Sequence, residues 1–128
     1  DLIIGSRYVS GGGSQGWDFK RKLLSSTANS TSRILLRSQV NDMTSGFRCY
    51  SQKSLNEIKY QQTQSDGYAF QIEMTLRCVE KKLSIKEVPI IFNERRVGKS
   101  KMSKKIIVEA LIFLFNNGIK RWLNLKII

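Results

Sequence analysis

The sequence predicts an α/β domain, because two kinds of hydrophobic pattern alternate along its 128 residues. Short apolar runs that end at glycine or contain proline are typical of strands. Apolar residues spaced three or four apart are typical of helices. A chain of this length with 41% hydrophobic residues is long enough for one domain with a modest core.

The first half of the chain is predicted to contain a strand, a loop and a long helix. Residues 1–6 form an apolar run that stops at a glycine, which is consistent with a buried strand. Residues 8–16 include four glycines and are expected to be a loop. Helical spacing runs from Asp18 to Leu36, and residues 41–46 break it.

The second half is predicted to run from a short extended segment to a basic helix. The expected segments are an extended stretch over 47–50, a weak helix over 51–60, a polar loop over 61–67, a helix over 69–82, a strand over 83–92, a charged loop over 93–103 and a helix over 104–122. Pro89 favours an edge or terminal position for the strand, because proline has no amide hydrogen to donate. Ser103 is a candidate N-cap of the last helix.

Charge and composition restrict the chemistry that the chain can perform. The net charge of +12 predicts anionic partners: nucleic acid, phosphorylated substrates or an acidic membrane face. The chain has no histidine, which excludes a Ser-His-Asp triad, a histidine base and histidine-ligated zinc. Two cysteines are too few for a disulfide framework, and both are expected to be reduced thiols.

The two ends of the chain support further expectations. The sequence begins at Asp1 inside an apolar run without a signal-peptide pattern, so we expect it to be a fragment. Residues 95–128 carry nine basic side chains and one acid around an apolar helix. Its apolar segment of roughly ten residues spans about 15 Å, half of a bilayer core. Either a membrane-interfacial helix or a core helix with a solvated basic end fits this pattern.

Three polar clusters are candidate sites. Arg7 follows the first strand and offers a bidentate grip on phosphate, although a solvated surface arginine fits equally. The segment 42–48 holds an acid, two hydroxyls, a glycine and an arginine, which fits either a pocket floor or an Asx-type turn. Residues 94–101 place four cations around Gly98, as in an anion clamp or a solvated loop, without the spacing of a P-loop.

Several short motifs occur in an order that resembles a known family. They are Gly5-Ser6-Arg7-Tyr8, Trp17 after the glycine-rich loop, Arg21-Lys22-Leu23-Leu24-Ser25, Thr44-Ser45-Gly46-Phe47-Arg48, Gly67-Tyr68-Ala69-Phe70-Gln71-Ile72-Glu73, Glu87-Val88-Pro89-Ile90, and Arg95 with Gly98-x-Ser100-Lys101. Over residues 1 to about 105 this series resembles the C-terminal half of polyprenyl-phosphate (dolichyl-phosphate) mannosyltransferases, which are family 2 glycosyltransferases with the GT-A fold.

The resemblance implies a fold and a reaction. It implies a partial GT-A fold, a mixed sheet with flanking helices that lacks the N-terminal nucleotide-binding half. Residues 1–103 would form the acceptor half and residues 104–128 a basic, membrane-interfacial helix. The implied reaction moves mannose from GDP-mannose to a polyprenyl phosphate, with inversion, at the cytoplasmic membrane face. The enzyme would be peripheral there, or integral if spans follow Ile128.

The resemblance also implies a cofactor and partners. A divalent metal, Mg²⁺ or Mn²⁺, would be held mainly by the missing half, because no Asp-x-Asp pair occurs in this chain. The isolated chain is therefore expected to be inactive. Its partners would be a nucleotide sugar, a polyprenyl phosphate lipid and the membrane surface, with no nucleic acid expected.

The resemblance assigns roles to particular residues. Arg7, Arg21 and Ser25 would hold the acceptor phosphate. Arg95, with Ser100 and Lys101, would close over the donor diphosphate or the acceptor. Gln71 and Glu73 would line the reaction centre, with Gln71 a candidate metal ligand. Asp42, Thr44, Ser45 and Arg48 would bind the substrate sugar. The residues expected to take part in catalysis are Arg7, Gln71, Glu73 and Arg95.

Two other readings stay open. The same fold could transfer glucose or another hexose from a UDP-sugar to the same lipid, since sugar specificity would depend largely on the missing half. A small basic module that binds nucleic acid or anionic membrane is the non-enzymatic alternative. That reading predicts aromatic residues interleaved with cations on one exposed face.

The clamp assignment can be tested in the full-length enzyme. Arg95→Ala should lower turnover on the order of 100-fold, because it removes a cation that would stabilise anionic groups. Lys86→Ala, at an expected surface position, should change turnover less than about twofold, as expected for a solvated charge. Steady-state mannosyl transfer measures both variants, and small, equal effects would place the clamp elsewhere.

Overall fold

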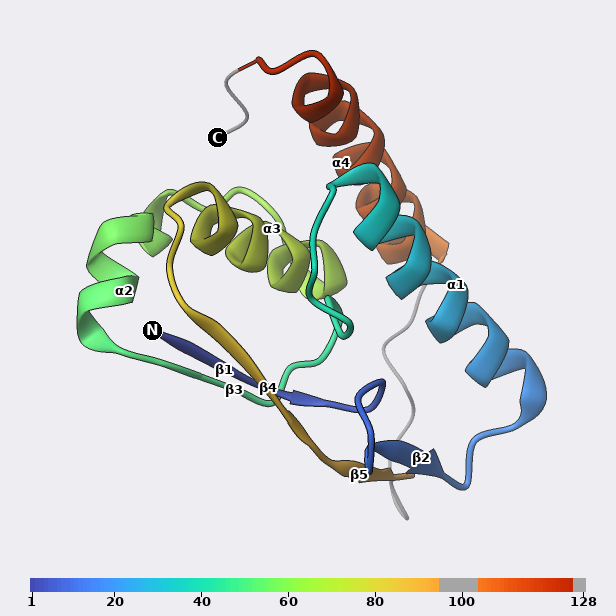
Figure 1. The fold of residues 1–128 in the computed structure, drawn as a ribbon. Helices are drawn as coiled ribbons and strands as arrows, with labels where there is room; N and C mark the ends of the chain where they lie inside the picture. The colour runs from blue at the N-terminus through green and yellow to red at the C-terminus, as the bar shows by residue number, and fades with distance from the viewer. Residues whose placement is uncertain (95–103, 126–128) are drawn as a thin grey trace.

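The fold confirms the α/β class and a mixed sheet with flanking helices (Figure 1). The computed structural model describes residues 1–94 and 104–125. Its elements are β1 (Leu2–Ser6), β2 (Gly13–Gln15), α1 (Phe19–Leu35), β3 (Arg48–Tyr50), α2 (Gln52–Ile58), the 3-10 helix η1 (Tyr60–Gln62), α3 (Gly67–Glu80), β4 (Ile85–Pro89), β5 (Ile91–Asn93) and α4 (Lys104–Trp122). Helices α1, α3 and α4 lie together on one side of the main sheet (Figure 1).

The main sheet has the strand order β3-β1-β4. β1 pairs with β3 antiparallel and with β4 parallel, so that Ile3 lies opposite Cys49 on one side and Lys86 on the other. Along β1, Leu2 and Ile4 are buried while Ile3 is 46% exposed. This alternation indicates that the helices cover only one face of the sheet. β4 is an edge strand of the described sheet, as Pro89 predicts.

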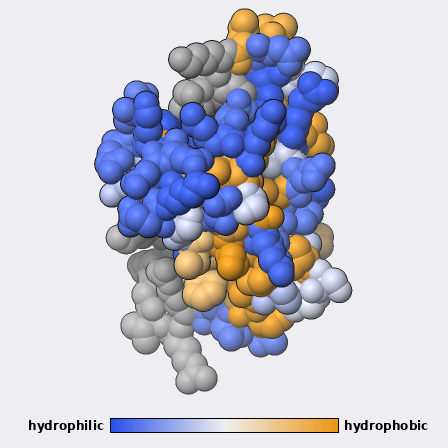
Figure 2. All heavy atoms as spheres, turned by 60° about the vertical axis from the view of Figure 1, so that its left-hand side comes forward, coloured by the Kyte–Doolittle hydropathy of each residue, from blue (hydrophilic) through white to orange (hydrophobic). Residues whose placement is uncertain are grey.

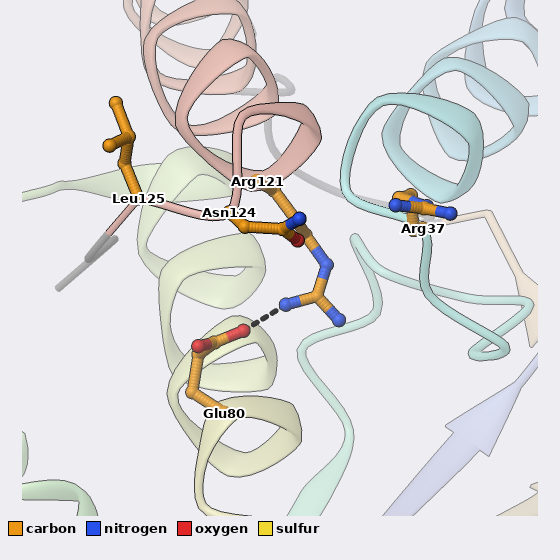
Figure 3. A pocket seen from close by; sticks show the side chains of 5 residues that line it. All are labelled: Arg37, Glu80, Arg121, Asn124 and Leu125. Carbon is orange, nitrogen blue, oxygen red and sulfur yellow. Dashed lines mark hydrogen bonds and ion pairs between the residues drawn. The ribbon is translucent and has the colours of Figure 1, made fainter.

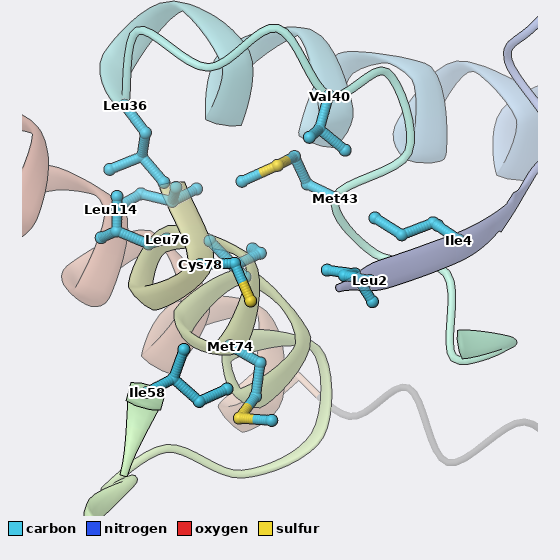
Figure 4. Packing of buried hydrophobic residues seen from close by; sticks show 11 residues of the cluster. Leu2, Ile4, Leu36, Val40, Met43, Ile58, Met74, Leu76, Cys78 and Leu114 are labelled. Atoms are coloured by element: carbon cyan, nitrogen blue, oxygen red, sulfur yellow. The ribbon is translucent and has the colours of Figure 1, made fainter. Parts of the chain in front are cut away.

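One hydrophobic cluster joins the covered face of the sheet to the helices (Figure 4). Leu2 and Ile4 meet Met43 from the loop after α1, and Leu76 of α3 continues the cluster toward Leu114 of α4. α3 contributes more buried positions than the other helices, because it lies between the sheet and α4. The core therefore fixes the end of β1 against the loop that follows α1.

Helix α1 begins and ends at residues whose chemistry explains its bounds. The Asp18 side chain caps the first turn by accepting a hydrogen bond from Arg21 N at 2.8 Å. The C-terminal end lies against α4, because a Cβ atom on Gly118 would stand 3.2 Å from Leu35 Cβ and 3.3 Å from Leu35 O. A glycine at that position lets the two helix backbones approach closely.

The structure differs from the sequence prediction at the glycine-rich loop and the late strand. Residues 13–15 form β2, which pairs parallel with β5 (residues 91–93). The predicted strand over 83–92 is divided at Ile90, which donates to Ser6 O at 3.0 Å and accepts from Gly13 N at 2.9 Å. These pairings join residues far apart in sequence, so local patterns could not reveal them. The expected cap at Ser103 lies outside the described residues.

None of the helices in residues 1–94 and 104–125 is both long and apolar enough to cross a bilayer. Helix α4 matches the predicted range 104–122. On the face that Figure 2 shows, hydrophilic atoms gather at the left and hydrophobic atoms form a band through the middle.

The two cysteines should differ in reactivity. Cys78 is fully buried, and burial raises the pKa of its thiol to about 11, with Arg48 acting in the opposite direction. At pH 8 the Cys78 thiol is therefore protonated, and it should resist iodoacetamide in the folded protein. Mass spectrometry should find Cys78 alkylated only after unfolding. Cys49 is exposed and should be alkylated in the folded protein. Alkylation of Cys78 in the folded protein at the rate of an exposed thiol would contradict the buried position.

Candidate functional site

The candidate site begins where β1 ends, at Arg7. The Arg7 guanidinium holds the Asp42 carboxylate with two hydrogen bonds, Nε to Oδ2 at 2.8 Å and Nη2 to Oδ1 at 2.7 Å. The Arg7 backbone N also donates to Asp42 Oδ2, and Nη2 donates to Thr44 Oγ1 at 2.9 Å. The Arg7 side chain is 10% exposed and Asp42 is fully buried. Two planar groups joined in this way have a defined mutual orientation.

Asp42 is itself held from two further directions. Its backbone N donates to Glu87 Oε1 of β4 at 2.8 Å, and Asn41 donates to the other oxygen of Glu87. Ser45 N donates to Asp42 Oδ1 at 3.0 Å, which closes an Asx-type turn. The turn reading of segment 42–48 is therefore confirmed.

The environment of Arg7 keeps its guanidinium charged. Burial lowers the pKa of the Arg7 guanidinium, but the hydrogen bond and negative charge of Asp42 outweigh that effect, so the pKa is raised overall. A buried charge is stable only when a partner compensates for lost hydration. Arg7 therefore remains a fixed cation at the end of β1.

Trp17 brings a second arginine to the same place. The Arg7 guanidinium carbon lies 5.3 Å from the centre of the Trp17 ring, and that of Arg21 lies 4.5 Å from it. Both distances are in the range of cation–π contacts. Phe92 of β5 meets the Trp17 ring edge-on at 5.4 Å. Trp17 therefore lies between the two arginines, Arg7 and Arg21, and the two-stranded sheet formed by β2 and β5.

Arg21 is less enclosed than Arg7. Its side chain is 27% exposed, and its Nη1 donates to Glu94 Oε1 at 2.6 Å, where Glu94 is 45% exposed. Surface ion pairs of this kind contribute little free energy, typically about 0–1 kcal/mol. Arg21 can therefore exchange Glu94 for another anion with little loss of free energy. Trp17 Nε1 is buried and has no hydrogen-bond partner among the described residues.

Ser25 joins this cluster through Tyr8. The Tyr8 hydroxyl donates to Ser25 Oγ at 2.7 Å, and the Arg7 guanidinium lies 5.5 Å from the Tyr8 ring centre. The structure thus brings together Arg7, Arg21 and Ser25, the three predicted phosphate ligands. We call Arg7, Tyr8, Trp17, Arg21 and Ser25 the anion cluster. The sequence analysis assigned no role to Tyr8 or Trp17, although both belong to the motifs that carry the family resemblance.

The predicted sugar-binding residues of segment 42–48 hold the loop in place. Thr44 Oγ1 accepts from Asn29 of α1, and Ser45 Oγ donates to Gly5 O at 2.6 Å. Arg48 donates from all three of its nitrogens, to groups that include Ser45 O at 2.6 Å and Met43 O at 2.8 Å. The buried Thr44 and Ser45 side chains therefore meet protein groups in this structure. Their contact with a sugar stays a prediction.

Gln71 and Glu73 lie on α3, and the hydrogen bonds shown for them go to residues outside the anion cluster. The carbonyl of Gln71 accepts from Arg48 Nη1 at 2.9 Å, which links the helix to the loop after α1. Glu73 is buried and accepts from Arg77 Nε and Nη2 and from two backbone amides of the loop before α3. These bonds tie α3 to its own preceding loop, and the predicted roles of both residues at a reaction centre stay predictions.

Three of the predicted site residues and the predicted metal site are separate from the contacts described above. Arg95, Ser100 and Lys101 lie outside the described residues. Within the described ranges, no three metal-ligating side chains form a group. The buried carboxylates of Asp42 and Glu73 and the half-buried carboxylate of Glu87 accept hydrogen bonds from protein donors at both oxygens. The metal, and Gln71 as a candidate ligand to it, therefore stay predictions.

A basic pocket lies at the C-terminal end of α1, away from the anion cluster (Figure 3). Its volume is about 410 Å³, and Arg37, Glu80, Arg121, Asn124 and Leu125 line it. The Arg121 guanidinium is paired with the Glu80 carboxylate. Arg121 Nε is buried without a hydrogen-bond partner in the part of the chain that the structure describes.

The anion cluster has the chemistry of a phosphate site. Guanidinium groups match phosphate oxygens in shape and charge, and a serine hydroxyl is an additional donor. The cluster lies beyond the carboxyl end of β1, beside the parallel pair β1–β4. Ligands of open α/β sheets bind at such ends.

Two relatives place the chain among known sequences, although no protein-family profile matches it. The chain is 45% identical to the polyprenol monophosphomannose synthase of Mycolicibacterium smegmatis over 120 residues, which are 94% of the chain and 45% of that protein. It is 40% identical to the undecaprenyl-phosphate mannosyltransferase of Micrococcus luteus over 127 residues, which are 98% of the chain and 52% of that protein.

This similarity confirms the predicted resemblance to polyprenyl-phosphate mannosyltransferases. The chain spans about half the length of the curated relatives that it matches. Both relatives are named for transfer of mannose to a lipid phosphate.

The Arg7–Asp42 pair should be essential for stability. Asp42→Asn leaves the buried Arg7 charge without its carboxylate and should lower the free energy of unfolding by about 3 kcal/mol. Urea denaturation followed by circular dichroism measures the change. Glu57→Gln is the control, because Glu57 pairs with Lys53 on the surface of α2 at 3.8 Å and should contribute less than about 0.5 kcal/mol. Equal effects of the two substitutions would show that the buried pair contributes no more to the free energy of unfolding than a surface pair does.

Proposed function

We propose that this chain is the acceptor-binding part of a polyprenyl-phosphate mannosyltransferase. The observation that carries the proposal is the anion cluster at the end of β1, where Arg7 and Arg21 share the Trp17 ring. The similarity to two mannosyl-transferring enzymes over almost the whole chain supports it.

The acceptor phosphate would bind at the exposed side of the anion cluster. Arg21 would turn from Glu94 to the phosphate, because a phosphate carries more charge than one carboxylate and offers more acceptor oxygens. Ser25 would donate a hydrogen bond, since its hydroxyl accepts from Tyr8 and keeps its own proton. Arg7 would add positive potential while it stays bound to Asp42.

The proposed reaction needs no general base. An acceptor phosphate oxygen is already anionic at neutral pH, so it can attack the anomeric carbon of mannose without losing a proton. The new carbon–oxygen bond would form as the bond from that carbon to the donor diphosphate breaks, and this single displacement inverts the anomeric centre. The absence of histidine is compatible with such chemistry.

We further propose GDP-mannose as the donor, bound mainly by residues outside this chain. The names of the two relatives favour mannose as the sugar. A divalent metal would neutralise the donor diphosphate when bound. Since the carboxylates of Asp42, Glu73 and Glu87 are engaged with protein donors, its ligands would come mainly from outside this chain. The chain alone is therefore expected to be inactive.

The rest of the enzyme would pack on the open face of the main sheet and complete a GT-A fold. Ile3 on β1 is 46% exposed and Phe47 beside β3 is 71% exposed. A sheet face with exposed large apolar side chains usually meets another layer. The relatives are about twice as long as this chain, so a layer of that size is available in them.

We place the enzyme at a membrane surface, on the cytoplasmic face, where its lipid acceptor would be reached. Helix α4 would lie in the interface, since it carries exposed apolar residues between basic ends. The lipid acceptors in the names of both relatives support this location.

The acceptor role of Arg21 can be measured in the full-length enzyme. Arg21→Ala should lower kcat/KM for a polyprenyl phosphate about 100-fold, because it removes a charged donor to the phosphate. The KM for the nucleotide sugar should change less than about twofold. Lys22→Ala removes a neighbouring exposed charge and is the matched control.

Either of two results would contradict the assignment. One is that Arg21→Ala and Lys22→Ala reduce kcat/KM equally, which would indicate a general effect of charge. The other is that Arg21→Ala changes only the KM for the donor. Circular dichroism of each variant checks that the fold is intact.

A further inference from the structure

Tyr8 connects the end of β1 directly to helix α1. Its backbone N donates to Ser6 Oγ at 3.3 Å, and Ser6 is fully buried in β1. Its ring centre lies 5.5 Å from the guanidinium carbon of Arg7, which is itself held by Asp42. Its hydroxyl donates to Ser25 Oγ at 2.7 Å. Tyr8 therefore reaches from a fixed strand to the helix that carries two of the proposed phosphate ligands.

Ser25 differs from another serine of the same helix. A serine inside a helix commonly donates its hydroxyl proton to the carbonyl four residues earlier. Ser32 does so, to Ala28 O at 2.7 Å. In the described part of the chain Ser25 makes no such bond, and its oxygen accepts from Tyr8 instead. The Tyr8 hydroxyl therefore sets the position of the Ser25 oxygen, and a hydroxyl that accepts one hydrogen bond is a stronger donor of the next.

The N-terminal half of α1 has little other support. Residues 19–28 include no buried residue, and the first buried position of the helix is Asn29. Asn29 ties the second half to the loop after α1, because it accepts from Met43 N at 2.8 Å. Among the described residues, two side-chain hydrogen bonds join residues 19–28 to parts of the chain beyond α1 and its cap: Tyr8 with Ser25, and Arg21 with Glu94.

Binding of the acceptor phosphate would remove one of these two bonds. In the proposed function Arg21 leaves Glu94 for the phosphate. The bond from Tyr8 to Ser25 then remains to hold this part of α1 at the end of β1. Arg21 and Ser25 are four positions apart, so they lie on one side of the helix. A shift of this turn would therefore move both ligands away from the fixed cation of Arg7.

We infer that Tyr8 is a positioning residue for the acceptor phosphate, an inference that rests on the proposed function. Its hydroxyl holds Ser25, and with Ser25 the turn of α1 that carries Arg21, while Arg21 exchanges its partner. Tyr8 acts through Ser25 and does not itself meet the phosphate. A phenol suits this position, because it donates a hydrogen bond without the negative charge that a carboxylate would bring near a phosphate.

Steady-state mannosyl transfer by the full-length enzyme tests this role. Tyr8→Phe keeps the ring and removes the hydroxyl. It should lower kcat/KM for a short-chain prenyl phosphate about tenfold, the loss expected for one hydrogen bond. The KM for the nucleotide sugar should change less than about twofold, because the hydroxyl acts on the acceptor ligands alone. Tyr60→Phe is the matched control: Tyr60 is 39% exposed, and it should change kcat/KM less than about twofold.

A second substitution tests whether Tyr8 acts through Ser25. Ser25→Ala alone should lower kcat/KM for the acceptor roughly 30-fold, because hydrogen bonds to a charged group are stronger than neutral ones. Adding Tyr8→Phe to Ser25→Ala should cause less than about a twofold further loss, since the bond between the two hydroxyls is already absent. A tyrosine that merely supported the fold would show its full loss in both backgrounds.

The outcomes separate this inference from the proposed function. Wild-type kinetics of Tyr8→Phe beside an impaired Ser25→Ala enzyme would overturn the inference and leave the proposed acceptor site standing. A further loss of about tenfold in the Ser25→Ala background would also overturn it, because Tyr8 would then act independently of Ser25. Wild-type acceptor kinetics of Ser25→Ala would overturn the proposed phosphate contact of Ser25 and the inference with it. Circular dichroism checks that each variant is folded.

Discussion

The buried pair of Arg7 and Asp42 is the interaction on which the arrangement of this molecule depends. Removing two charges from water is costly, and only a complete set of hydrogen bonds makes it tolerable. Asp42 receives donors from Arg7 and Ser45, and Glu87 of β4 holds its backbone. Asn29 of α1 adds bonds to the same loop. The strand, the loop and the helix therefore meet at one charged contact.

Because Arg7 is held by this pair, Arg7 and Arg21 have different roles in the anion cluster. Arg7 is committed to Asp42 and contributes a fixed positive potential. Arg21 is held by a surface carboxylate of Glu94 and by the Trp17 ring, so exchanging partners costs it little. A cluster with one fixed and one exchangeable cation can attract an anion and then bind it. The shared Trp17 ring keeps the two guanidiniums in one place.

Local patterns predicted the helices well and the long-range contacts poorly. The range predicted for the last helix, 104–122, is that of α4, because apolar spacing over many residues is a strong signal. β2 was missed because its partner β5 lies more than seventy positions away. The order of motifs predicted that Arg7, Arg21 and Ser25 belong together. The sequence could not show that Arg7 pairs with Asp42 or that Glu73 pairs with Arg77. A charged residue has the same sequence signal whether its partner is a ligand or another side chain of the protein.

The most direct test is a structure of the full-length protein with a short-chain prenyl phosphate. The account predicts phosphate oxygens within hydrogen-bond distance of the Arg21 guanidinium and Ser25 Oγ, with the Arg7–Asp42 pair unchanged and Arg21 released from Glu94. A phosphate bound elsewhere, with the Arg21–Glu94 pair intact, would contradict it. So would a phosphate that reaches Arg21 only after Arg7 has left Asp42.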